Sequence, residues 1–185
     1  MSKVLVVVDM QRDFVNGALG TKEAATIVPK VVEKINEFNG IICVTYDTHT
    51  EDYLNTQEGK NLPIVHCVEY SDGWVLTPPV YDALKERSDT KPWTSFRKST
   101  FGSIELAYWL WKRMEDEEES IDEVIIVGLC TDICVISNAI LIKTFLPEIK
   151  VTVDAACCAG VTPESHNKAL SVMKMCQINI ENWET

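Results

Sequence analysis

The hydrophobic pattern of the chain consists of short apolar runs separated by longer amphipathic stretches. Four continuous runs are rich in β-branched residues, and they cover residues 4–8, 41–45, 124–129 and 151–153. Apolar runs without alternating polar positions are typical of strands that are covered on both faces. The sequence therefore predicts four buried strands.

The stretches between these runs show helical periodicity. Residues 21–38 repeat apolar side chains at helical spacing, and Asn39-Gly40 follows as a stop signal. Residues 103–114 and 132–145 have a similar pattern, and Thr162-Pro163 begins a last helix with a capping residue and a first-turn proline. Residues 51–63 and 77–98 lack a clear pattern and are predicted to be long, irregular loops.

Alternating strands and helices predict an α/β fold. Parallel strands need crossover connections, so we expect a Rossmann-like, three-layer α/β/α sandwich with a mainly parallel central sheet. No repeat, linker or change in composition divides the chain, which indicates one domain over residues 1–185. In such sheets the ligand site lies beyond the carboxyl ends of the strands.

Composition narrows the possible functions. The 17 basic and 28 acidic residues give a net charge of −11, which disfavours nucleic acid and anionic membranes as partners and leaves small molecules and proteins.

No apolar run is long enough to span a bilayer, and the N-terminal run is too short for a signal peptide, so a cytoplasmic protein is expected. Seven cysteines without a CxxC pair indicate reduced thiols that mostly pack in the core. The acidic run at residues 115–119 is predicted to be solvated.

Cys134 is a candidate nucleophile because it follows a predicted strand end and begins a predicted helix. A helix N-terminus lowers a thiol pKa, and its free N–H groups can stabilise an oxyanion. Asp9, at the end of the first strand, could act as its base once burial raises the carboxyl pKa. Lys98 could supply a cation between them. The alternatives are core packing for Cys134, a turn residue for Asp9 and a surface position for Lys98.

A second group of polar residues suggests a metal site. Asp47 and His49 lie one residue apart at a strand end and can face the same ion, and the following loop can bring His66 to it. A carboxylate with two imidazoles suits zinc, iron or manganese and leaves positions open for water and substrate. The alternative is a hydrogen-bonded Asp–His pair. His166 has no such neighbours in sequence and is predicted to be structural.

Five motifs in order resemble the isochorismatase-like cysteine hydrolase superfamily, and within it the nicotinamidase/pyrazinamidase branch. They are VVDMQRDF at 7–14, YDTH at 46–49, HCV at 66–68 with Gly73 shortly after, Lys98 with FGS at 101–103, and GLCTDICV at 128–135. The turn after His66 departs from the family pattern, because Glu69 to Gly73 stand where a Gly-Thr-x-Gly turn is usual. That departure leaves the proposed catalytic residues unaffected.

The resemblance implies a catalytic triad of Asp9, Lys98 and Cys134 that hydrolyses an amide through a thioester. It also implies a cis peptide bond before Cys130, which directs the N–H groups of Cys130 and Cys134 into an oxyanion hole.

The nicotinamidase branch adds one divalent metal ion that binds the pyridine nitrogen of the substrate. For this chain we expect zinc first, with iron or manganese as alternatives. The resemblance places its ligands at Asp47, His49 and His66. Many members use a histidine as the remaining ligand, but this chain has no third nearby histidine and offers Glu58 or Glu51 instead. Related enzymes use a glutamate shortly before the last histidine, so the resemblance implies Glu58, with Glu51 as the alternative. Phe14 and Phe101 are expected to line the substrate ring, although core packing is an alternative for each.

The expected activity is the conversion of nicotinamide to nicotinate and ammonia in NAD salvage, by a protein that forms a homo-oligomer as is common in the family. One alternative is another cysteine amidase of the superfamily that acts on a carbamoyl, ureido or other small amide without a metal. A lower-ranked alternative is a non-catalytic interaction module. Isochorismatase chemistry is disfavoured because the hydrolysis of a vinyl ether does not need the retained cysteine.

Overall fold

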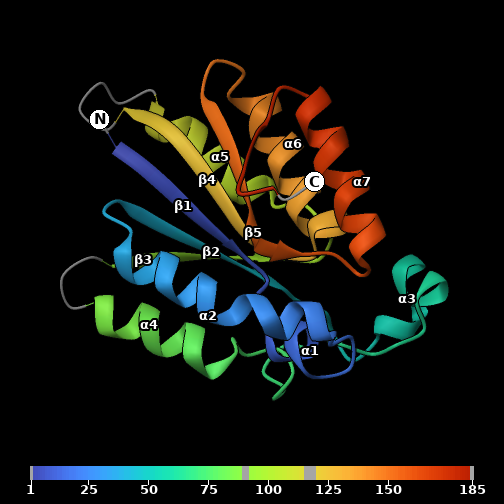
Figure 1. Cartoon of the computed structure of the whole chain (residues 1–185). Helices are drawn as coiled ribbons and strands as arrows, with labels where there is room; N and C mark the ends of the chain where they lie inside the picture. Colours follow the sequence, from blue (N-terminus) through green and yellow to red (C-terminus); the bar gives the residue numbers. More distant parts are fainter. Residues whose placement is uncertain (1, 89–91, 115–119, 184–185) are drawn as a thin grey trace.

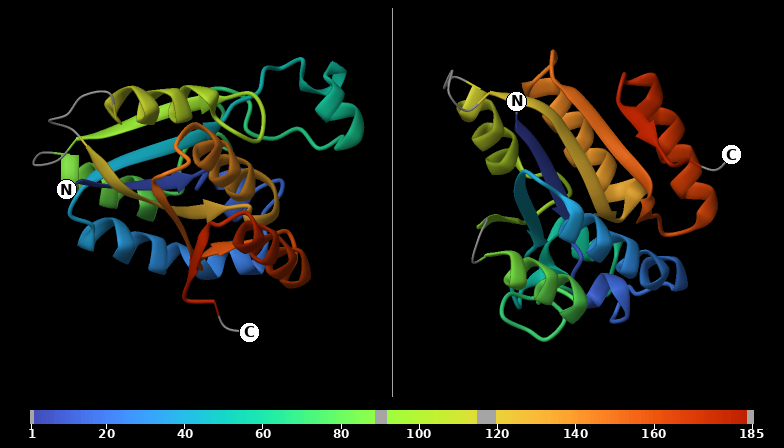
Figure 2. Two further views of the ribbon diagram at one scale, coloured as in Figure 1. Left: turned by 90° about the horizontal axis from the view of Figure 1, so that it is seen from above. Right: turned by 60° about the vertical axis from the view of Figure 1, so that its left-hand side comes forward.

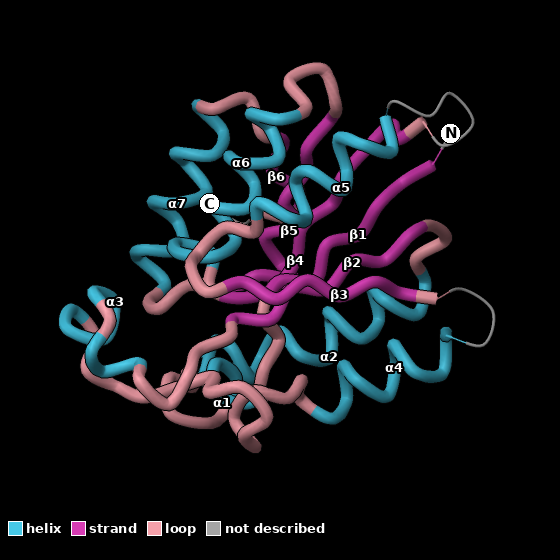
Figure 3. Tube along the Cα trace, turned by 180° about the vertical axis from the view of Figure 1, so that it is seen from behind, coloured by secondary structure: helices cyan, strands magenta, loops and turns pink. Residues whose placement is uncertain are grey.

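A six-stranded sheet forms the centre of the computed structural model, which describes residues 2–88, 92–114 and 120–183. The strands are β1 (Ser2–Val8), β2 (Ile41–Asp47), β3 (Trp93–Lys98), β4 (Ile121–Leu129), β5 (Lys150–Ala159) and β6 (Asn179–Glu181). Their order is β3-β2-β1-β4-β5-β6, and every neighbouring pair is parallel (Figures 1 and 3). The predicted parallel sheet is confirmed.

Helices cover both faces of this sheet (Figures 1 and 2). One face carries α1 (Arg12–Val15), α2 (Lys22–Glu37) and α4 (Pro78–Ser88), and the other carries α5 (Ile104–Met114), α6 (Ile136–Phe145) and α7 (Pro163–Met175). Each face has its own apolar cluster, and alternate β1 side chains enter one or the other. The predicted three-layer sandwich is therefore confirmed, and β1 is buried on both sides as its apolar run predicts.

The predicted irregular segments contain regular structure, so this part of the sequence interpretation was wrong. The described part of residues 77–98 contains α4 and β3, and residues 51–63 contain the 3-10 helix η1 (Tyr53–Asn55) and α3 (Gln57–Asn61). Strand β3 lies at the sheet edge with only Phe96 and Lys98 buried, so it lacks a continuous apolar run. Strand β6 has three residues and was also missed.

The helix boundaries follow the capping residues in the sequence. The hydroxyl of Thr21 accepts a hydrogen bond from the Ala24 N–H at 3.0 Å, and Thr162 forms a reciprocal capping box with Ser165 at the start of α7. The predicted helix at 132–145 is divided. A π-helical turn, Thr131–Val135 (η3), precedes α6.

The strand order places the predicted site residues together. Strands β1 and β4 are neighbours although the chain first runs outward through β2 and β3, so the connections diverge at this point of the sheet. Gly128, near the end of β4, has φ +118°, and a Cβ there would lie 2.1 Å from the Val8 carbonyl oxygen. A glycine is thus required where β4 passes β1 before Cys130 leaves the sheet.

Three further expectations concern the whole chain. All seven cysteines are free, as predicted. Within the described ranges, no helix is long and apolar enough to cross a membrane. The acidic run at 115–119 lies outside the described residues, so its predicted solvation remains a prediction.

The buried carboxylate of Glu123, near the start of β4, contacts side chains of both neighbouring strands, β1 and β5. It pairs with Lys3 and Lys150, each at 2.7 Å, and accepts a hydrogen bond from Thr152 at 2.9 Å. Burial alone would raise the Glu123 pKa, but these three partners lower it from 4.5 to about 2. The ionised form is therefore stabilised by folding.

We expect Glu123→Gln to lower the free energy of unfolding at pH 7 by about 1–2 kcal/mol. Because the native pKa is depressed, this stabilisation is present above the unfolded pKa of 4.5 and is lost as the pH falls toward about 2. Urea unfolding at pH 7, 4 and 3 measures the difference, with Glu33→Gln on the exposed side of α2 as control. A difference that stays constant over this range would contradict the assignment.

Candidate active site

Asp9, Lys98 and Cys134 meet at the carboxyl ends of β1, β3 and β4. The Lys98 Nζ lies 2.6 Å from the Asp9 carboxylate and 3.4 Å from the Cys134 Sγ. All three residues are buried, with exposed fractions of 0%, 5% and 6%. The Asp9 carboxylate also accepts a hydrogen bond from the Thr45 hydroxyl at 2.6 Å. The structure thus brings the three predicted residues into one cluster.

Burial and mutual charge set the protonation of this cluster. Burial raises the pKa of Asp9 despite the nearby Lys98 charge, as the sequence predicted. Burial and the Asp9 charge raise the pKa of the Cys134 thiol well above its usual value, although Lys98 opposes them. The expectation that the helix N-terminus lowers this pKa is therefore wrong for the free protein. Cys134 is a thiol at rest and needs a base.

Cys134 lies in the π-helical turn η3. The Cys130 carbonyl accepts hydrogen bonds from the N–H groups of Ile133 and Val135 at 3.1 and 3.0 Å. The Leu129–Cys130 peptide bond is cis, as the resemblance implied. The side chain of Asn138 closes the turn on its other side, because its amide donates to the Cys134 carbonyl at 2.8 Å.

Asp47, His49 and His66 form a second buried cluster beside the first. One potential ligand atom from each lies within 4.8 Å of the others. The Asp47 carboxylate is 2.9 Å from the His49 Nε2 and 3.4 Å from the His66 Nε2, and its other oxygen is 3.3 Å from the Lys98 Nζ. His49 Nε2 is buried, and its close contact with the Asp47 carboxylate does not have hydrogen-bond geometry. Two imidazole nitrogens that converge on one buried carboxylate fit a divalent metal ion.

Backbone hydrogen bonds pair residues 67–69 with His49, just after β2, and this pairing brings His66 close to His49. The His49 N–H donates to the Cys67 carbonyl, and the Glu69 N–H donates to the His49 carbonyl, both at 2.9 Å. His66 Nδ1 bonds the Ile64 carbonyl at 2.8 Å, so its Nε2 faces the cluster. Tyr53 packs against both imidazole rings, at centroid distances of 4.6 and 5.0 Å.

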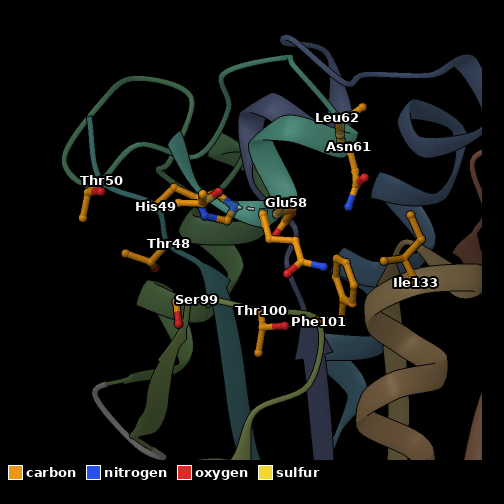
Figure 4. Close-up of a pocket in the computed structure, with 12 residues that line it drawn as sticks. Thr48, His49, Thr50, Glu58, Asn61, Leu62, Ser99, Thr100, Phe101 and Ile133 are labelled. Atoms are coloured by element: carbon orange, nitrogen blue, oxygen red, sulfur yellow. Dashed lines mark ion pairs between the residues drawn. The ribbon is translucent and has the colours of Figure 1, made fainter. Parts of the chain in front are cut away.

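Of the two glutamates considered as the remaining ligand, only Glu58 lies near the cluster. Its carboxylate is 3.8 Å from the His49 Nε2, and α3 presents it to an open cavity that Glu58 and His49 both line (Figure 4). Glu51 is exposed and does not line that cavity. The geometry therefore favours Glu58 over Glu51.

Gln11 is a site residue that the sequence interpretation missed. Its buried amide donates to the carbonyls of Asp47 and Trp74 and accepts from the Asp47 N–H, each at 2.8 Å. This fixes the end of β2 against the first loop. Gln11 lies within the 7–14 motif, but nothing in its pattern indicated which strand it would contact. Tyr53 was missed because its segment was taken as an irregular loop.

A pocket of about 200 Å³ joins the two clusters. It is lined by Cys134, Asp47 and His66 together with apolar side chains that include Phe14 and Phe101. A larger, open cavity of about 600 Å³ adjoins it and shares Glu58, Leu62, Phe101 and Ile133 (Figure 4). The two aromatic residues predicted to contact a substrate therefore face the pocket. Leu62 and Ile133 were not predicted.

This fold and arrangement match a known family. The Isochorismatase domain family model matches residues 3–185, and the chain belongs to this family of hydrolases. A relative from Bacillus subtilis (strain 168), described as "Uncharacterized isochorismatase family protein PncA", is 27% identical over 180 residues, which cover 92% of this chain and 93% of that protein.

Solved structures share the fold. The nicotinamidase/pyrazinamidase PncA from Bacillus subtilis superposes with a TM-score of 0.81 at 24% identity and covers 97% of this chain and 99% of its own. The pyrazinamidase of Pyrococcus horikoshii, solved in complex with zinc, superposes with a TM-score of 0.74 at 28% identity. The match covers 99% of this chain and 100% of that one. The predicted superfamily is confirmed.

Proposed function

We propose that this protein is a metal-dependent nicotinamidase, which hydrolyses nicotinamide to nicotinate and ammonia. The observation that carries the proposal is one small pocket lined by Cys134 of the buried Asp–Lys–Cys cluster and by Asp47 and His66 of the buried Asp–His–His cluster. The first cluster suits attack on an amide carbon, and the second suits a metal that binds a ring nitrogen. The similar structures named for nicotinamidase and pyrazinamidase activity support this assignment.

The first half of the reaction forms a thioester. Asp9, whose pKa is raised by burial, takes the proton of the Cys134 thiol, and the sulfur adds to the amide carbon. Lys98 contacts both groups and offsets the negative charge that moves between them. Asp9 then returns the proton to the amide nitrogen, the C–N bond breaks, and ammonia leaves.

The second half hydrolyses the thioester. Asp9 removes a proton from water as the water oxygen adds to the acyl carbon, the C–S bond breaks, and Asp9 gives this proton to the sulfur, which regenerates the Cys134 thiol. The released nicotinic acid loses its proton to solvent as nicotinate. In both halves the carbonyl oxygen becomes an oxyanion, for which we assign the N–H groups of Cys130 and Cys134 as donors. Their turn is held by the backbone bonds to the Cys130 carbonyl.

The metal-binding residues would be Asp47, His49, His66 and Glu58. When bound there, a divalent ion supplies a Lewis acid that binds the pyridine nitrogen and holds the ring. These ligand types accept zinc, iron or manganese, and we propose zinc as the resident ion. The chain's own contribution is orientation, since Ile64 fixes the His66 ring and Gln11 fixes the Asp47 backbone.

The pocket volume supports a small substrate. About 200 Å³ is below the range that is typical of drug-sized ligands, and the apolar lining suits one aromatic ring between Phe14 and Phe101. We further propose that the enzyme forms a homo-oligomer and acts in NAD salvage, as the family resemblance implies. From the sequence pattern we also propose a single domain over residues 1–185 and a cytoplasmic location.

We expect purified protein to release ammonia and nicotinate from nicotinamide in equal amounts. Chelation should lower the rate by about 100-fold or more, and zinc or manganese should restore it. Coupled ammonia detection and chromatography of nicotinate measure both products. Metal-loaded protein that hydrolyses ureido or carbamoyl compounds but not nicotinamide would overturn the substrate assignment.

A further inference from the structure

A hydrogen bond links the last long helix to the nucleophile turn. His166 of α7 and Thr131 of η3 are joined by a 2.8 Å contact between the imidazole Nδ1 and the threonine hydroxyl. Thr131 is fully buried, and it lies between Cys130 and Cys134. His166 was predicted from the sequence to be structural, with no neighbours of interest, but its ring contacts the segment that carries both proposed oxyanion donors.

A second contact connects the same two elements. The Asp132 carboxylate accepts a hydrogen bond from the Val161 N–H at 3.2 Å, just before α7 begins. Gly160 lies so close to His166 that an added Cβ would be 2.9 Å from the histidine Cβ. The start of α7 is therefore joined to η3 by the Asp132 and Thr131 contacts, while Gly160 packs against the other side of the His166 backbone.

The imidazole is well suited to hold a hydroxyl. Burial lowers the pKa of His166, against a smaller opposing effect of Asp132, so the ring is uncharged near neutral pH. One ring nitrogen of a neutral imidazole accepts and the other donates, so Nδ1 can accept the Thr131 proton. The buried hydroxyl would otherwise lose this partner, and an unpaired buried hydroxyl costs free energy.

We propose that His166 is a positioning residue, which holds Thr131 and thereby aligns the N–H groups of Cys130 and Cys134 with the oxyanion. This inference rests on the proposed function only in assigning those two N–H groups as donors. A small displacement of a catalytic group can cost about 100-fold in rate. Loss of the His166–Thr131 hydrogen bond should therefore slow acyl transfer, the step in which the oxyanion forms. The protonation of Cys134 depends instead on Asp9 and Lys98, which His166 does not touch.

Two thiol reagents separate these effects without using nicotinamide. Acylation by p-nitrophenyl acetate forms a C–S bond to Cys134, breaks the ester C–O bond and releases nitrophenolate, and it passes through an oxyanion. Alkylation by iodoacetamide displaces iodide and forms no oxyanion. We expect His166→Ala and Thr131→Val to slow acylation by about 10-fold or more and to change alkylation by less than about 2-fold.

Matched variants test whether Nδ1 is the His166 atom that holds the Thr131 hydroxyl. The amide of Asn can take the place of Nδ1, whereas the longer Gln reaches toward the place of Nε2, so His166→Asn should restore acylation and His166→Gln should not. Thr131→Ser keeps the hydroxyl and should behave as the wild type. His166→Ala/Thr131→Val should be no slower than either single variant, because both remove one interaction.

Three results would overturn the proposal. One is unchanged acylation in His166→Ala and Thr131→Val, and another is an equal fall in acylation and alkylation, which indicates a general loss of structure. The third is equal behaviour of His166→Asn and His166→Gln, a comparison that remains valid even if the alanine variant does not fold. Failure of the nicotinamidase assignment appears separately, as wild-type acylation without release of ammonia from nicotinamide.

Discussion

Replacement of Cys134 by alanine is expected to lower the rate of nicotinamide hydrolysis by about 1,000-fold or more. The thiol forms the bond to the amide carbon, and neither Asp9 nor Lys98 can replace it. Ammonia release at saturating nicotinamide measures this loss. Substrate binding should persist, because the pocket walls and the metal-binding residues are unchanged.

Cys158→Ala is the matched control for this variant. Cys158 is as buried as Cys134, at 4% exposed, but it lies on β5, and its Sγ contacts the Ile126 carbonyl at 3.9 Å. Its replacement should leave the rate within about 3-fold of the wild type, because it touches none of the reacting groups. Comparable activity in Cys134→Ala and the wild type would refute a covalent mechanism at this residue.

Removal of an imidazole from the second cluster is expected to have the next largest effect. We expect His66→Ala to lose bound metal and to lower kcat/KM for nicotinamide by about 100-fold or more, since even residues that only orient metal ligands are worth about 10–100-fold. His66 Nε2 faces Asp47 at 3.4 Å, and no other described imidazole except His49 lies in the cluster. Metal analysis of purified protein and steady-state kinetics measure the two effects.

Glu51→Gln and Glu58→Gln separate the possible fourth ligands. Glu58 lies 3.8 Å from His49 Nε2, so its replacement should weaken metal binding, whereas the exposed Glu51 should be replaceable without effect. A His66→Ala protein that retains full activity after dialysis against chelator would contradict the metal role. Loss of metal in Glu51→Gln but not in Glu58→Gln would reverse the ligand assignment.

The sheet and its long helices could be predicted because their burial is local and continuous. Strand β1 is apolar at every position from Val4 to Val8, and α2 presents a regular buried stripe that starts after Thr21. Strand β3 could not be predicted in this way, because an edge strand buries few of its side chains. Its position became clear only from its pairing with β2.

The residues of the site likewise divide into those that the strand pattern predicts and those whose position depends on tertiary packing. Asp9, Asp47 and Cys134 follow or end recognisable strands, so their meeting at one edge of the sheet could be expected from the fold class. The contacts of Tyr53 and His166 depend on how a loop and a helix pack against that edge, and no local pattern encodes such packing. The raised thiol pKa is likewise a consequence of burial, which outweighs the helix N-terminus considered from sequence alone.

The central claim is that hydrolysis proceeds through an acyl group on Cys134, and partitioning by hydroxylamine tests it most directly. The metal-loaded enzyme is given nicotinamide or methyl nicotinate in the same hydroxylamine buffer, and nicotinohydroxamate and nicotinate are measured. A shared nicotinoyl thioester predicts the same ratio of the two products from both substrates, because the leaving group has departed before partitioning. Different ratios, or no hydroxamate from either substrate, would contradict the mechanism.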